Sequence, residues 1–302
     1  MDLGLINPKF QELETDYLYH LGLDNSMDLE HIFSGVKYVI LTRSNEDVSL
    51  IARQFAKVLY NILEDDFIFT ARFKVERYHL YKVGPILTIS YGLGMPSMLI
   101  CLNEITKLMA HMSYTDVVFF KIAPAGGLGC TVGDVVVTDE AVNTKLEPYY
   151  TNIECGVEHS YPTQFNSELI ADVLDFNHKN YTKKINISVG KSIAAMDFYE
   201  ETGRLDGALD VDFTLDEQRE YFERAMELGI KSIDLESTLF AGFCNQLGIR
   251  ACALSYVVVD RLQRDEVLSQ DSNSWPVKEG AFHLIIQYIT HKLGLPTANE
   301  KV

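Results

Sequence analysis

Residues 36–59 read VKYVILTRSNEDVSLIARQFAKVL, and this stretch decides the fold class. Its first seven residues are mostly apolar and rich in branched side chains, which predicts a buried strand over residues 36–42. Apolar side chains then recur at helical spacing from Val48 to Ile62, so we expect an amphipathic helix over residues 46–63. A strand that leads directly into a helix is typical of an α/β protein.

The same alternation continues along the chain. Strands are predicted over residues 85–91, 116–122, 133–138, 185–189, 231–235 and 250–259, and helices over residues 97–112, 215–228, 237–247 and 279–293. Strands that are apolar on both faces belong in a mostly parallel sheet covered by helices on both sides. Because the sequence has no low-complexity segment, linker or fixed-period repeat, we predict a single α/β domain over residues 1–302.

The charge composition indicates which classes of molecule this protein is expected to bind. The 302 residues include 26 Lys and Arg against 43 Asp and Glu, which gives a formal net charge of −17. Such a surface repels phosphate backbones and anionic lipid headgroups, so we expect neither nucleic acid nor a membrane as partner. No apolar run approaches the ~18 residues of a spanning helix, and the acidic N-terminus lacks the layout of a secretory signal. The five cysteines show no metal-ligand or disulfide spacing, which favours reduced thiols, no metal site and a cytoplasmic location.

Three segments that follow predicted strands are candidate ligand loops, because ligands of α/β sheets bind beyond the carboxyl ends of the strands. Gly92-Leu93-Gly94 could present backbone N–H groups to an anion or simply form a tight turn. Residues 123–129 read APAGGLG, where paired glycines permit either a close ligand or a turn. Residues 234–237 read DLES, where a carboxylate could accept sugar hydroxyls or merely complement a helix dipole. From the residues alone these alternatives stay open.

Taken together, the order of several motifs resembles the animal uridine phosphorylases of the nucleoside phosphorylase family. The resemblance runs nearly end to end, and the motifs that carry it are DYLYH at residues 16–20, FSGVKYV at 33–39, RYHLYKVGP at 77–85, GLGMPS at 92–97, AGGLG at 125–129, DFYE at 197–200, GRLDGAL at 203–209 and DLES at 234–237.

The resemblance implies a three-layer α/β/α fold with a mostly parallel central sheet. It implies a homodimer whose N-terminal arm, about residues 1–30, lies at the dimer interface. The family reaction is reversible phosphorolysis of uridine to uracil and ribose 1-phosphate, with phosphate as co-substrate and without a metal or organic cofactor. Its catalysis rests on positioning and electrostatics, with no covalent intermediate on the protein.

The resemblance also implies roles for individual residues. Glu236 would accept bonds from the ribose hydroxyls, with Leu235 packing on the sugar, and His20 would reach the ribose 5′-OH from the partner subunit. Phe198 would stack near the base and Arg204 would donate to a uracil carbonyl. Arg77 would contact phosphate across the dimer interface, and no residue is singled out as catalytic.

The sequence departs from the family at the phosphate and base sites. Ungapped alignment places Asp47 where the family has a phosphate-binding arginine, and a repulsive charge there would cost several kcal/mol. Arg43, one helical turn earlier, could take its place. Lys121 stands for a second arginine and lacks its bidentate fork, while Pro124 replaces a phosphate-binding threonine.

At the base site, Thr202 replaces a glutamine that both donates and accepts along the pyrimidine edge. We therefore expect a uridine phosphorylase-like protein that binds a pyrimidine nucleoside or base and whose catalysis is weak or lost. It could pair with an active paralogue through the dimer surface. The alternatives are an active uridine phosphorylase with a rebuilt phosphate site and, with less support, a nucleoside hydrolase.

Overall fold

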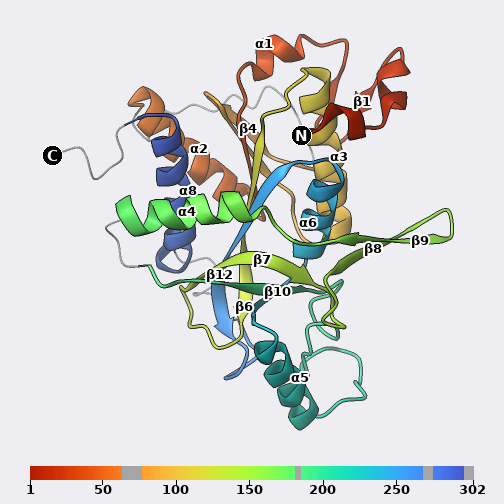
Figure 1. Ribbon diagram of the computed structural model, residues 1–302, viewed down its shortest axis with the longest axis vertical. Helices are drawn as coiled ribbons and strands as arrows, with labels where there is room; N and C mark the ends of the chain where they lie inside the picture. Colours follow the sequence, from red (N-terminus) through yellow and green to blue (C-terminus); the bar gives the residue numbers. More distant parts are fainter. Residues whose placement is uncertain (63–76, 181–184, 268–274, 296–302) are drawn as a thin grey trace.

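The computed structural model describes residues 1–62, 77–180, 185–267 and 275–295 (Figure 1). Its centre is an eight-stranded sheet in the order β11-β10-β7-β12-β6-β3-β5-β4. The strands are β3 (Tyr38–Thr42), β4 (Leu80–Val83), β5 (Ile86–Ser90), β6 (Val118–Gly127), β7 (Val135–Val142), β10 (Ile187–Ala194), β11 (Ile230–Asp234) and β12 (Arg250–Asp260). Two small antiparallel pairs accompany it, formed by β1 (Tyr17–Leu18) with β2 (Leu23–Asp24) and by β8 (Tyr149–Glu154) with β9 (Val157–Pro162).

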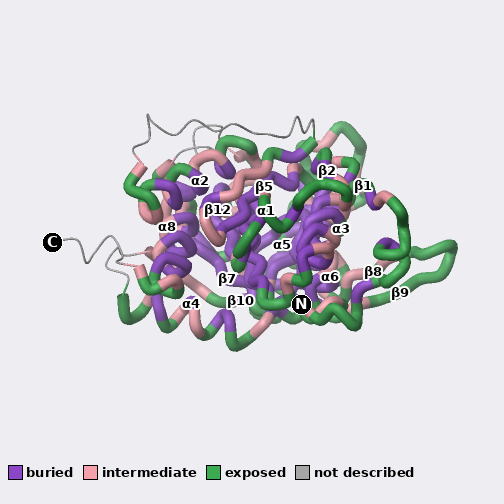
Figure 2. Tube along the Cα trace, turned by 90° about the horizontal axis from the view of Figure 1, so that it is seen from above, coloured by how far each residue is buried: buried purple, intermediate pink, exposed green. Residues whose placement is uncertain are grey.

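Helices cover both faces of the sheet, so the predicted three-layer arrangement is confirmed. They are α1 (Leu29–Phe33), α2 (Asn45–Tyr60), α3 (Met95–His111), α4 (Ser167–Asn180), α5 (Leu215–Glu227), α6 (Ser237–Gln246) and α8 (Trp275–Lys292), with two 3-10 helices at Leu3–Leu5 and Pro8–Glu12. Helices α2, α8 and α4 lie on one side and α3 and α6 on the other, with the buried strands between them (Figure 2).

The sheet is mixed rather than purely parallel. Among the described strands, five pairings are parallel and three are antiparallel. Strand β11 pairs with the end of β6 as well as with β10, so the far end of the sheet curls back on itself. The parallel pairings place the carboxyl ends of β3, β5, β6 and β12 at one edge, where ligand sites of α/β sheets lie.

The segment at residues 123–129 differs from the prediction, because β6 does not end at residue 122. Its residues up to Gly127 stay in the sheet, paired with β12 on one side and with β11 on the other. The paired glycines serve close packing. A Cβ at Gly126 would lie 2.8 Å from Cγ of Arg261, and one at Gly127 would lie 2.8 Å from Cγ1 of Val257. Glycine is therefore needed so that the end of β12 can lie against β6.

Helix α4 and the β8–β9 hairpin were not predicted. Most residues of the hairpin are exposed, so it lacks the alternating apolar pattern that identifies a half-buried strand. Among the described residues, no helix combines the length and apolar character needed to cross a bilayer.

Candidate functional site

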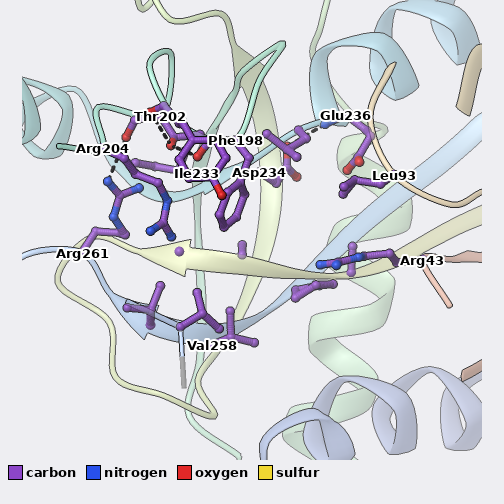
Figure 3. Close-up of a pocket in the computed structure, with 18 of the residues that line it drawn as sticks. Arg43, Leu93, Phe198, Thr202, Arg204, Ile233, Asp234, Glu236, Val258 and Arg261 are labelled. Atoms are coloured by element: carbon purple, nitrogen blue, oxygen red, sulfur yellow. Dashed lines mark hydrogen bonds between the residues drawn. The ribbon is translucent and has the colours of Figure 1, made fainter. Parts of the chain in front are cut away.

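A cavity of about 550 Å³ opens at the carboxyl ends of β5, β6, β11 and β12 (Figure 3). This volume falls within the range of small-molecule sites. Its lining is largely apolar, with polar groups gathered at two ends, and consists of Arg43, Tyr91, Leu93, Ala123, Pro124, Ala125, Gly126, Phe198, Tyr199, Thr202, Arg204, Ile233, Asp234, Leu235, Glu236, Val258, Val259, Arg261 and Val267.

Glu236 is the acceptor at one end of the cavity. It is buried at the N-terminus of α6, and its Oε1 accepts a hydrogen bond of 2.7 Å from the backbone N–H of Gly94. The hydroxyl of Tyr91 lies 3.4 Å from Oε2. Burial raises the pKa of Glu236 above its ordinary value, although Lys121 and Arg43 act in the opposite direction. The glycine loop at residues 92–94 thus does hold an anion, which is the carboxylate of this protein's own Glu236.

Two buried guanidinium groups occupy the other end. Arg204 lies over the ring of Phe198 at 4.2 Å, and its Nε–H is buried without an acceptor among the described residues. Arg261 donates from one Nη to the carbonyl of Thr202 at 2.9 Å and from Nε to Asp265 at 3.0 Å. Desolvation lowers the pKa of Arg261. Figure 3 shows Arg204 and Arg261 side by side near Thr202 and Phe198, on the opposite side from Arg43 and Glu236. An aromatic face beside donor groups suits a planar base that carries carbonyl oxygens.

Thr202 lines this end of the cavity but directs its donor elsewhere. Its hydroxyl donates to the carbonyl of Phe198 at 2.6 Å and lies 3.2 Å from the carbonyl of Tyr199. The hydroxyl proton is therefore engaged with the backbone, and only an oxygen lone pair remains for a ligand. The donor capacity of a glutamine at this position is absent.

Arg43 supplies the positive charge at the Glu236 end. Its side chain is exposed on the cavity wall and makes no hydrogen bond or ion pair within the described part of the chain. Lys121 does not line the cavity. It is fully buried, and its Nζ donates to Oδ2 of Asp234 at 2.6 Å and to Oγ of Ser237 at 3.1 Å. Pro124 lies on the cavity wall and offers no N–H.

The structure places Asp47 away from the cavity wall. Its carboxylate is buried in the first turn of α2 and accepts a hydrogen bond of 2.6 Å from Nζ of Lys278 on α8. Its charge is therefore compensated by a lysine rather than directed at a ligand. The effect of Asp47 on a bound phosphate stays a prediction, and its pairing with Lys278 weakens the expected repulsion.

His20 and Arg77 lie outside the cavity. The Nδ1 atom of His20 is 2.6 Å from Oε1 of Glu104, and an Nη of Arg77 donates to Oγ of Ser97 at 3.1 Å. The rings of His20 and Tyr78, which follows Arg77, are 6.1 Å apart, so the two candidates share one surface of the molecule. Their action on the cavity of a partner subunit stays a prediction.

Sequence reasoning missed Arg261. The residue comes directly after β12, the long apolar strand that ends at Asp260. A charged pair at the carboxyl end of a central strand was the signal that could have identified it.

The profile of the phosphorylase superfamily matches residues 37–281. Uridine phosphorylase 2 of Mus musculus is 32% identical over 290 residues, which cover 96% of this chain and 90% of that protein. The chain belongs to the uridine phosphorylase family. Inactive uridine phosphorylase B of Schistosoma mansoni is 31% identical, with 96% and 97% of the two chains covered. The crystal structure of uridine phosphorylase from Schistosoma mansoni in complex with thymine has a TM-score of 0.87 and 31% identity, and covers 96% of this chain and all of that one.

Membership of the uridine phosphorylase family confirms the resemblance and the α/β fold that the sequence predicts. The relatives include proteins named for the activity and a protein named as inactive. Family membership therefore does not establish whether this chain turns over uridine, and that question depends on the residues of the site. Seven of the sequence-predicted site residues meet in one cavity, namely Arg43, Pro124, Phe198, Thr202, Arg204, Leu235 and Glu236. Their roles toward a ligand remain predictions.

Proposed function

We propose that this protein binds a pyrimidine nucleoside in the cavity and that its phosphorolysis is slow or absent. The observation that carries this proposal is the position of Lys121, whose Nζ lies on Asp234 instead of on the cavity wall. The family resemblance predicts two positively charged residues for phosphate within one subunit. At the first position Lys121 is bonded to Asp234, and at the second the chain has Asp47. Among the described lining residues, Arg43 is then the single cation at the Glu236 end of the cavity.

Nucleoside binding is supported by the two polar ends of the cavity. Glu236 would accept bonds from the ribose hydroxyls, with Leu235 against the sugar. Phe198 would contact the base, and the unpartnered Nε–H of Arg204 would donate to a base carbonyl. A thymine complex of a relative with the same fold agrees with a pyrimidine in this class of site.

Slow phosphorolysis follows from the demands of the reaction. A phosphate oxygen forms a bond to the anomeric carbon while the bond from that carbon to the base nitrogen breaks, and the base leaves with the electron pair and is then protonated. The enzyme must bind a dianion against a sugar that gains positive charge, which requires donors placed around the phosphate. Each missing contact of this kind commonly costs ~10–10³ in rate. Here Lys121 is engaged, and Pro124 has neither hydroxyl nor N–H.

We further propose a homodimer in which His20 and Arg77 complete the cavity of the partner subunit, or a heterodimer with an active paralogue. Both side chains are anchored on their own subunit and lie outside its cavity. No metal or organic cofactor is required in this proposal, since phosphate is the co-substrate. The five free cysteines suit a reducing compartment such as the cytoplasm.

An active uridine phosphorylase is the second candidate, and Arg43 is the observation that favours it. Its guanidinium is unpaired within the described residues and lies close enough to Glu236 to lower the pKa of that carboxyl. A fork-shaped donor there could bind phosphate in place of the arginine that Asp47 replaces.

One experiment separates these functions. Uridine is incubated with the protein with and without phosphate, uracil release is followed, and uridine binding is measured by calorimetry. Uridine binding with little or no uracil release supports the proposal. Rapid release that depends on phosphate and is lost in Arg43→Ala supports the second candidate, and release without phosphate would identify a hydrolase. Failure to bind either uridine or uracil would contradict all three.

A further inference from the structure

Lys121 is held by acidic and hydroxyl groups of the segment that carries Glu236. It projects from β6, the central strand that pairs with both β3 and β12. Its Nζ lies 2.6 Å from Oδ2 of Asp234, 3.1 Å from Oγ of Ser237 and 3.7 Å from Oε2 of Glu236. Two of the three N–H donors of the amine are therefore engaged in hydrogen bonds, and the amine also lies at ion-pair distance from Glu236.

Asp234 transmits this anchorage to the start of α6. Its Oδ1 accepts the backbone N–H groups of Glu236 at 3.2 Å and of Ser237 at 3.0 Å, while Oδ2 also accepts the hydroxyl of Ser237. Both carboxylate oxygens are thus occupied, Oδ1 by backbone N–H groups of the turn and Oδ2 by Lys121 and the Ser237 hydroxyl. The turn at residues 234–237 directs Glu236 into the cavity, where its carboxylate accepts hydrogen bonds from Gly94 and Tyr91.

We propose that Lys121 is a positioning residue for ribose recognition: through Asp234 it holds the turn at residues 234–237 and keeps Glu236 directed into the cavity, and it does not bind phosphate. This inference rests on the proposed nucleoside site and deepens it. Two buried carboxylates lie side by side at the start of α6, and an unpaired buried charge is costly. A lysine beside both carboxylates lowers that cost, whereas a lysine turned toward phosphate would leave Asp234 without its cation. The charged groups that face Glu236 are Lys121, Asp234 and Arg43, with the hydroxyl of Tyr91.

The test compares affinities for uridine and uracil in Lys121→Met, because only uridine carries the ribose. We expect the affinity for uridine to fall about tenfold while that for uracil changes less than about threefold. The double variant Lys121→Met/Asp234→Asn removes both charges and serves if the single variant is unstable; it should show the same selective loss. Lys278→Met is the matched control, since it removes another buried lysine that pairs with an acid away from the cavity. It should leave the ratio of the two affinities unchanged.

Two further measurements complete the test. Phosphate should raise the melting temperature of Lys121→Met as much as that of the wild type, and loss of this response would make Lys121 a phosphate ligand and overturn the inference. A carboxyl titration of Glu236 by ¹³C NMR, assigned with Glu236→Gln, needs no ligand. Lys121→Met should shift the pKa of Glu236 upward, since the lysine lowers it.

The outcomes distinguish the two proposals. A wild type that binds neither ligand contradicts the proposed function, while the NMR titration still decides the role of Lys121. An unchanged titration curve, or equal losses of uridine and uracil affinity, overturns the positioning role.

Discussion

At the scale of single residues, the effect of a charge depends on its partner. Asp47 occupies a position that the sequence relates to phosphate, yet its carboxylate pairs with Lys278, which lies 231 residues away along the chain. Lys121 is likewise paired with Asp234 across 113 residues. Both pairings are long-range, so neither could be predicted from local sequence. The sequence identified Asp47 and Lys121 as departures from the family pattern, but it did not predict the direction of their side chains.

Removing Asp47 should therefore change stability rather than phosphate binding. Asp47→Ala leaves Lys278 buried without its acid, and breaking such a pair costs ~3–5 kcal/mol of unfolding free energy. Denaturant unfolding measures this loss. The control is Asp175→Ala, which removes the acid of the exposed pair with Lys179 and should cost below ~1 kcal/mol.

Asp47→Arg provides the complementary test. It would place a second cation against Lys278, so we expect a less stable protein and no greater rise in melting temperature with phosphate than the wild type shows. Chloride at matched ionic strength controls for screening. A clearly larger rise in melting temperature with phosphate would show that position 47 faces the end of the cavity that holds Arg43 and Glu236.

At the scale of elements, glycines at the ends of strands decide the shape of the site. Gly94 has φ = 81° and directs its N–H to Glu236, and Gly126 allows Arg261 to lie against β6. The sequence indicated that these loops mattered and left their role open between ligand and turn. In the structure both segments support cavity side chains and also contribute lining residues of their own, so contact with a ligand stays a prediction. That β6 continues through Gly127 could not be predicted, because its pairing with β11 joins residues far apart in sequence.

Gly94→Ala should weaken both the fold and the site. An alanine at this φ costs ~1–3 kcal/mol, and relief of the strain would move the N–H away from Glu236. Gly133→Ala is the matched control, since Gly133 also has a positive φ, lies in open space and does not line the cavity. Both variants should lower the melting temperature, but only Gly94→Ala should weaken uridine binding measured by calorimetry. Equal uridine affinity in the two would show that Gly94 does not position Glu236.

At the scale of the whole molecule, the positions of His20 and Arg77 bear on assembly. His20 is fixed to α3 through Glu104, whose carboxylate also accepts the backbone N–H groups of His20 and Leu21. Such anchorage outside the cavity fits a residue that serves a neighbouring subunit. The family resemblance predicted this role, and a single chain does not test it.

Mixed dimers give that test. We expect a stable dimer by sedimentation at micromolar concentration, and we expect His20→Ala and Glu236→Gln each to weaken uridine binding in their own homodimers. A heterodimer of the two variants, purified through two different tags, should regain one wild-type uridine site per dimer, because Glu236 of one chain meets His20 of the other. If the heterodimer binds no better than the two homodimers, His20 does not act across the interface.

The central claim is that the cavity binds a pyrimidine nucleoside but that phosphorolysis is slow. The turnover rate tests this claim most directly. The rate of uracil release at saturating uridine and phosphate is compared with that of an active uridine phosphorylase assayed in parallel. Because the amine of Lys121 is bonded to Asp234 and does not line the cavity, and because Pro124 offers no donor, we predict a rate at least ~10³-fold lower than that enzyme, with uridine binding retained. A rate within about tenfold of the active enzyme would contradict the account and show that Arg43 rebuilds a competent phosphate site.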